Sequence, residues 1–84
     1  MLELTDRAAE ALARSASAAA RFDPDASLRV EPAGGSIAVT IVHGPQPGDD
    51  TIRRGDLHVH VDPSLAGTLD VVDPHETFVL IAPR

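Results

Sequence analysis

The chain has 84 residues, a net charge of −6 and no cysteine, which limits it to one small domain without disulfides. Its acidic surface would repel phosphate groups and it contains no lysine, so nucleic acid and anionic membranes are poor partners. The longest apolar run, Phe78–Ala82, is far too short to cross a bilayer and no secretion signal opens the chain, so we expect a cytoplasmic protein.

The first predicted element is a helix over Asp6–Arg21, a segment rich in alanine. Thr5 is a good N-cap, and Asp6 places a negative charge at the positive end of the helix dipole. Pro24 cannot continue the helix and ends it. The residues expected on its apolar face are Leu4, Ala8, Ala11, Leu12, Ala19 and Phe22. A second face carries Arg7, Arg14 and Arg21, which indicates either an ordinary solvated face or a strip that binds a partner.

Beyond the helix, apolar and polar residues alternate, which is typical of strands in a half-exposed sheet. Ala33-Gly34-Gly35 predicts a turn, and the proline- and glycine-rich segment Gly44–Asp50 predicts a surface loop. Asp62 followed by Pro63 predicts a short second helix over Ser64–Gly67. The predicted strands are Leu28–Glu31, Ser36–His43, Thr51–Arg54, Asp56–Asp62, Leu69–Val72 and Thr77–Ala82, with a hairpin turn at Gly55 and a turn over Asp73–Glu76.

One N-terminal helix packed on several strands predicts a single α+β domain over residues 1–84, and its specific motifs resemble a known family. In chain order, these motifs are MLELTDRAAEAL, LRV, VHGPQPGDDTIRRGDLHVHVD (42–62), PSLAGTL and TFVLIAPR. Together they are similar to the HesB-like A-type iron–sulfur cluster carriers. The resemblance implies a small mixed, mostly antiparallel β-structure with the helix on it. It also implies a role in iron–sulfur biogenesis, because that family binds iron or a cluster through three cysteines.

The chain departs from the family at those three positions. The first family cysteine belongs to the turn that is Ala33–Ser36 here, so Ser36 is the residue in its place. The other two belong to a Cys-Gly-Cys-Gly tail, whereas this sequence ends at Ala82-Pro83-Arg84. Clusters are held by soft thiolates, and a serine hydroxyl stays protonated near neutral pH. We therefore expect no bound cofactor and no cluster-carrying ability.

The remaining constellation of interest is the pair His58 and His60. In a strand, alternate residues point to the same side about 7 Å apart, so both imidazoles could bind one divalent metal such as zinc, iron(II) or nickel. A third ligand would have to come from elsewhere, for example His43 or His75. The alternative interpretation is the polar face of a half-buried strand, and Asp62, which would follow on that face, already has a capping role.

An enzyme is not expected from this sequence. No serine sits in a nucleophile-elbow motif, no carboxylate pair is placed for acid–base chemistry, and no glycine-rich loop has the spacing that binds phosphates. A domain this small is only marginally stable alone, so self-association is a reasonable way to bury more surface. The sequence thus predicts a non-catalytic scaffold module that binds a protein partner or itself, with metal binding by His58 and His60 as the alternative.

Overall fold

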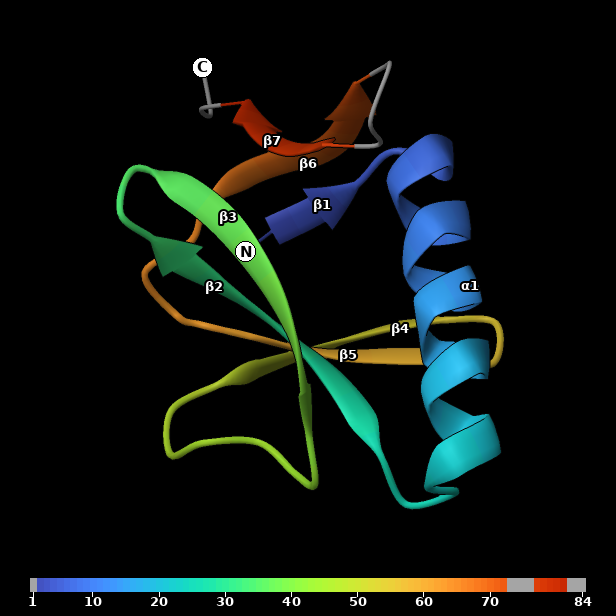
Figure 1. Cartoon of the computed structure of the whole chain (residues 1–84). Coiled ribbons are helices and arrows are strands. Elements are labelled where there is room, and N and C mark those ends of the chain that lie inside the picture. Colours follow the sequence, from blue (N-terminus) through green and yellow to red (C-terminus); the bar gives the residue numbers. More distant parts are fainter. Residues whose placement is uncertain (1, 73–76, 82–84) are drawn as a thin grey trace.

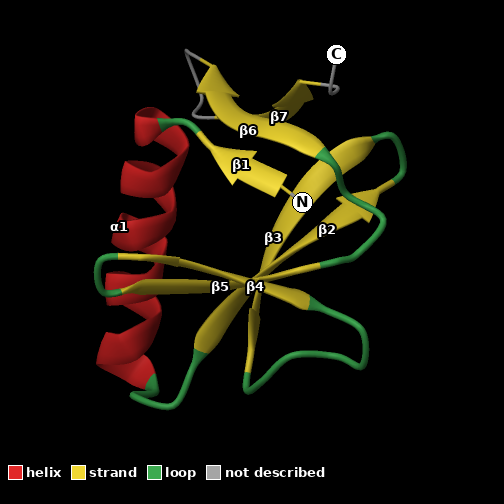
Figure 2. Ribbon diagram, turned by 180° about the vertical axis from the view of Figure 1, so that it is seen from behind, coloured by secondary structure: helices red, strands yellow, loops and turns green. Residues whose placement is uncertain are grey.

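The computed structural model describes residues 2–72 and 77–81, and it contains one helix packed against two small sheets (Figures 1 and 2). The predicted α+β architecture is confirmed. The elements in chain order are β1 (Leu2–Leu4), α1 (Asp6–Phe22), β2 (Ser27–Ala33), β3 (Ser36–Val42), β4 (Asp50–Arg54), β5 (Leu57–Val61), β6 (Gly67–Val72) and β7 (Thr77–Ile81).

The two sheets have the strand orders β1-β6-β7 and β3-β2-β5-β4. Sequence neighbours pair in antiparallel fashion, as β2 does with β3, β4 with β5, and β6 with β7. The pairs β1–β6 and β2–β5 join segments distant in sequence and are parallel. The sheet structure is therefore mixed and mostly antiparallel, as expected. The three-residue strand β1 is absent from the sequence-based prediction, because its pairing depends on a segment more than sixty residues away.

Thr5 begins the helix as predicted, and it also attaches the helix to the sheet. Its side-chain oxygen accepts the N–H of Ala8 at 3.2 Å and donates to a carboxylate oxygen of Asp70 at 2.7 Å. Its own N–H donates to the carbonyl of Leu69 at 3.0 Å. Because Leu69 and Asp70 belong to β6, a single residue both satisfies free N–H groups of α1 and fixes the first turn of α1 against the sheet.

The buried face of α1 carries Ala8, Ala11, Leu12 and Ala19, as predicted. The placement of Phe22 on that face is wrong, since its side chain is 92% exposed. The helix ends at this point, because the N–H of Asp23 donates to the carbonyl of Ala19 and Asp23 itself is extended. Phe22 therefore lies in the last turn, beyond the part of α1 that contacts the core.

The core lies between α1 and the two sheets. Its completely buried members come from one helix and three strands, which explains why the alternating residues of β2 and β5 are valine and leucine. They are Leu12, Leu28, Val30, Val59, Val61 and Leu69. Within residues 2–72 and 77–81, no helix combines the length and the apolar character that crossing a membrane would require.

The predicted glycine turn is confirmed, and the predicted short helix is wrong. Gly34 and Gly35 both have positive φ, at 54° and 84°, and connect Ala33 to Ser36 in the two-residue turn that suits a twisted hairpin. After β5, by contrast, Asp62 caps a single turn. Its side chain accepts the N–H of Ser64 at 2.8 Å and its carbonyl accepts that of Leu65 at 3.1 Å. Leu65 is buried in the core, so the chain enters β6 directly.

Two further expectations fall partly outside the described residues. The turn predicted over 73–76 and the end of the strand predicted over 77–82 belong to segments that the structure does not describe, although β7 itself is present as Thr77–Ile81.

Candidate functional site

His58 and His60 lie on one side of β5, as their spacing predicts, while Leu57, Val59 and Val61 between and around them are buried. Across the hairpin, Arg53 is opposite His58 and Thr51 is opposite His60. On the other side of β5, Arg29 of β2 is aligned with His60. The face of the sheet that carries the two histidines is thus a polar face, flanked by cationic and hydroxyl side chains.

The two imidazoles differ in their surroundings. His58 is exposed and lines a shallow hollow together with Asp25 and Asp56. His60 is half-buried, and its Nδ1 lies 3.4 Å from the hydroxyl of Thr51. Both rings therefore keep some access to solvent, which a metal ion would need.

The structure does not bring a third ligand to this pair. His43 instead contacts the carboxylate of Asp23 at the end of α1, with its Nε2 2.5 Å from the oxygen. His75 lies outside the described residues. In the part of the chain that the structure describes, no three His, Asp or Glu side chains are grouped so that they could hold a metal ion. Metal binding at His58 and His60 accordingly stays a prediction.

Beside His60 lies a charged cluster around Arg29 of β2, which is 4% exposed. Its Nε and one terminal nitrogen donate to the two carboxylate oxygens of Asp49 at 2.9 and 3.0 Å. The other terminal nitrogen donates to Glu31 at 2.6 Å, and Asp62 accepts a further bond at 3.2 Å. We call Arg29, Glu31, Asp49 and Asp62 the arginine cluster.

The arginine cluster joins three segments that are distant in sequence. The side chain of Asp49 is only 1% exposed, and it also accepts the N–H of Gln46 at 2.9 Å, which closes the end of the predicted surface loop. Asp62 is the residue that caps the turn before β6. Arg29 thus fixes the 44–50 loop and the 62–65 turn to the same strand.

Electrostatics in the cluster favour the ionised forms. The hydrogen bonds from Arg29 hold the pKa of Asp49 below its usual value, and those from Ser64, with a smaller contribution from Arg29, do the same for the pKa of Asp62. Asp49 in turn raises the pKa of Arg29. No buried side-chain nitrogen or oxygen among the described residues lacks a partner. A cluster whose buried groups are all satisfied by one another in this way holds the fold together.

Sequence reasoning missed the arginine cluster, because its carboxylates are spread over more than thirty residues. The one available signal is Arg29 itself, which stands between Leu28 and Val30 in a strand. A charged residue at the middle of a buried strand requires compensation, but the sequence does not say from where.

Ser36, which the resemblance puts in the place of the family's first cysteine, begins β3 directly after the glycine turn and is exposed. A hydroxyl there is available to solvent, but it is a hard and protonated donor. Residues 82–84, which the resemblance compares with the start of the family's cysteine-bearing tail, lie outside the described residues. The described chain thus offers no thiolate anywhere.

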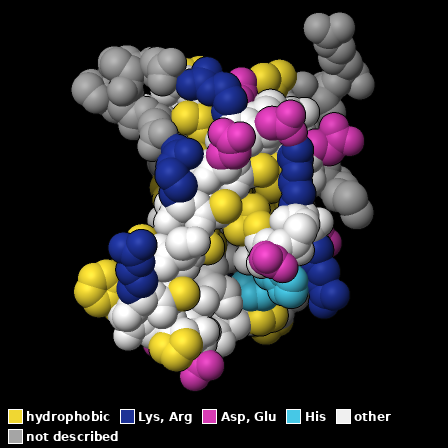
Figure 3. All heavy atoms as spheres, turned by 90° about the vertical axis from the view of Figure 1, so that its right-hand side faces the viewer, with side chains coloured by type: hydrophobic (Ala, Val, Ile, Leu, Met, Phe, Trp, Pro, Cys, Tyr) yellow, Lys and Arg dark blue, Asp and Glu magenta, His cyan; other side chains and the backbone are white. Residues whose placement is uncertain are grey.

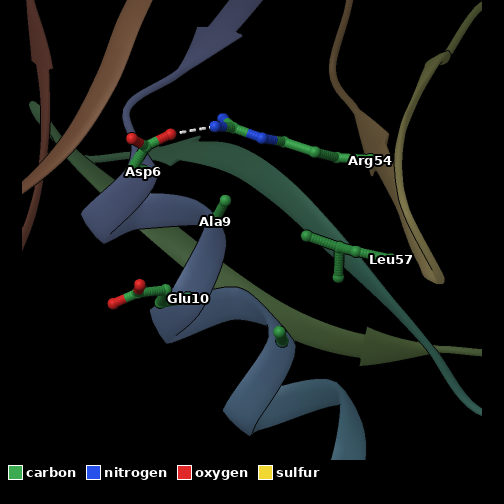
Figure 4. A pocket seen from close by; sticks show the side chains of 6 residues that line it. Asp6, Ala9, Glu10, Arg54 and Leu57 are labelled. Carbon is green, nitrogen blue, oxygen red and sulfur yellow. Dashed lines mark hydrogen bonds and ion pairs between the residues drawn. The ribbon is translucent and has the colours of Figure 1, made fainter.

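A second hollow, of about 310 Å³, lies between the β4–β5 hairpin and the first turns of α1 (Figure 4). Arg54 reaches across it, donating to the carbonyl of Leu4 at 2.8 Å and pairing with the carboxylate of Asp6. Arginine and carboxylate side chains both lie on this side of the molecule, with no large patch of one sign (Figure 3). The hollow is therefore bridged by an ion pair.

Comparison with known proteins identifies the fold. No protein-family model matches the chain, and no curated protein matches it. Among solved structures, a crystal structure of IscA with a 2Fe–2S cluster is similar, with a TM-score of 0.64 and 20% sequence identity over 99% of this chain and 86% of the IscA chain. The chain therefore has the IscA-like, HesB-like fold, built from a sequence that contains no cysteine.

Proposed function

We propose that this protein is a cytoplasmic, non-catalytic relative of the iron–sulfur cluster carriers that works through protein contacts, as a scaffold or binding module, and carries no cluster. The observation that supports this is a single contrast. The fold matches that of IscA over 99% of the chain, yet none of the 84 residues is a cysteine.

The side chains available as metal ligands support the proposal that this protein carries no iron–sulfur cluster. Iron–sulfur clusters are bound by thiolates, and even the centres that use two histidines retain two cysteines. The resemblance puts Ser36 at the position of the family's first cluster ligand. The carboxylates of the arginine cluster beside His60 are engaged by Arg29 at 2.6 to 3.2 Å. What the fold can still offer a partner is surface, including exposed apolar side chains such as Phe22 and Ile41.

Anaerobic reconstitution with ferrous iron and sulfide tests the proposal. We expect desalted protein with neither visible charge-transfer absorption nor acid-labile sulfide, while IscA treated in parallel becomes coloured. Iron and sulfide that remain with the protein in stoichiometric amounts through gel filtration would overturn the proposal.

The second candidate function is divalent metal binding by His58 and His60. It is favoured by their shared side of β5 and by the solvent access of both rings. Titration with zinc or iron(II), followed by calorimetry, should then give an affinity that the His58→Ala/His60→Ala variant loses. His43→Ala is the matched control, because that ring is engaged with Asp23 and should not affect binding. Equal affinities for the wild type and the double variant would exclude this site.

A further inference from the structure

Strand β3 forms an open edge of its sheet. Within residues 2–72 and 77–81 its one ladder partner is β2, and β7 approaches it without pairing to it. In Figure 1 the strand runs across the front of the molecule, with no other element drawn over it. Such an edge presents a row of backbone donors and acceptors that another strand can use.

The two edges of this four-stranded sheet differ in the protection that they carry. Strand β4, at one edge, contains Asp50, Arg53 and Arg54 in five residues. Strand β3, at the other, has the sequence SIAVTIV, with no charge, proline or glycine in seven residues. Natural proteins place charges or proline on edge strands to prevent pairing with other chains. The protection is present on β4 and missing on β3.

The glycine turn determines which backbone groups of β3 are free. A β-turn bond joins Ala33 to Ser36, so this pair is a hydrogen-bonded one, and the pairs along the β2–β3 ladder then alternate. By this alternation Ser36, Ala38, Thr40 and Val42 bond to β2. The N–H and C=O groups of Ile37, Val39 and Ile41 point to the open edge.

The side chains of these residues also suit a partner strand. Ile37 and Val39 pack partly against the core, whereas Ile41 is 63% exposed although it belongs to the same side of the strand. An antiparallel copy of β3 centred on Val39 would place Ile41 beside Ile37 of the second copy. A large apolar side chain that is exposed in the single chain would then be covered.

We propose that β3 is the self-association surface of this protein, with a second copy paired antiparallel to it and Val39 on the two-fold axis. In this register the outward residues meet as Val39 with Val39 and Ile37 with Ile41, so every free donor and acceptor of the edge is bonded. A two-fold interface must be self-complementary in this way. Each copy carries a charge of −6, but β3 carries none, so no like charges stand opposite each other.

This inference rests on the proposed role in protein contact, and the mass of the protein in solution tests it. We expect light scattering with gel filtration to show a dimer at tens of micromolar. The Ile41→Pro variant should be a monomer with unchanged circular dichroism, because the lost N–H points away from β2. Thr51→Pro, the same change at an outward position of β4, should remain a dimer.

Cysteine pairing tests the register, because the chain has no other thiol. Ala38 and Thr40 of two copies would form a non-hydrogen-bonded pair with Cα atoms about 4.5 Å apart, within the range for a disulfide. Oxidising Ala38→Cys mixed with Thr40→Cys should therefore give more linked dimer than either variant alone. Preferential linkage within either single variant would overturn this register.

The outcomes separate this inference from the proposed function. A dimer that survives Ile41→Pro but is lost in Phe22→Ser would move the contact to the end of α1 and overturn the inference, leaving the scaffold role intact. A monomeric wild type at all concentrations would also overturn it. Cluster binding, which is measured separately by iron and sulfide content, would overturn the proposed function.

Discussion

Arg29 shows most clearly how one side chain organises this molecule. A guanidinium that is 4% exposed would be costly alone, but its donors meet Asp49, Glu31 and Asp62 at 2.6 to 3.2 Å. The planar fork allows the two-point contact with Asp49, which a lysine could not make. The exposed pair of Arg54 and Asp6 has the same charges but lacks the burial, with side chains 42% and 86% exposed.

We therefore expect mutations at these two ion pairs to lower the stability of the protein by different amounts. Asp49→Asn removes the two-point acceptor and leaves Arg29 with less compensation, so we expect a clear drop in the urea midpoint of unfolding. Arg54→Ala should shift that midpoint much less, because ion pairs in solvent contribute little. Equal shifts of the urea midpoint for the two variants would show that the arginine cluster contributes no more to stability than the exposed ion pair.

The two ends of α1 differ in their contacts with the rest of the fold. Its first turn is fixed to β6 through Thr5 and Asp70, and its middle is buried at Leu12, which has no exposed surface. Its last turn leaves Phe22 in solvent. The apolar pattern of the sequence identified the buried face, but it could not tell that the contact with the core would end before the helix does.

This difference can be measured along the same helix. Leu12→Ala opens a cavity in the core, and we expect it to lower the free energy of unfolding by about 3 kcal/mol. Phe22→Ala removes a side chain that is already in water and should change the stability by less than about 0.5 kcal/mol. Chemical denaturation of both variants checks the pair. A large loss of unfolding free energy for Phe22→Ala would show that this ring makes a contact outside the single chain, for example with a second copy.

At the scale of the whole molecule, ionised carboxylates connect elements at several points. Asp49 bonds Arg29, Asp62 bonds Ser64, Asp70 bonds Thr5, and Asp23 bonds His43, and each of these contacts lowers the pKa of its carboxyl below 3.8. A carboxyl with a lowered folded pKa stabilises the fold above its unfolded pKa, and this contribution is lost as the pH falls through the folded value.

Stability should therefore respond to acid in a defined window. We expect these four carboxyls to add no pH dependence between about pH 5 and 7, and a progressive loss of unfolding free energy below about pH 4. Urea unfolding at a series of pH values checks this. Asp49→Asn should show a shallower acid slope than the wild type, because it lacks one of the four titrating groups. An identical slope in both proteins would contradict this assignment.

Local chemistry allowed several features to be predicted from the sequence. The N-cap at Thr5, the helix that follows it, the turn at Gly34 and Gly35, and the placement of His58 and His60 on one side of a strand depend on neighbouring residues alone, and all are present. The absence of a thiolate is likewise a property of composition. These features need no knowledge of what packs where.

Only the tertiary structure decided the features that join distant segments. Strand β1 forms because β6 lies beside it, and Arg29 is stabilised because Asp49 and Asp62 are brought to it. After Asp62 the chain makes a single turn and no helix, with Leu65 buried in the core. Ile41 is exposed, although Ile37 and Val39 on the same side of β3 pack against the core. Backbone propensities act over a few residues, whereas pairing, burial and charge compensation depend on the complete packing.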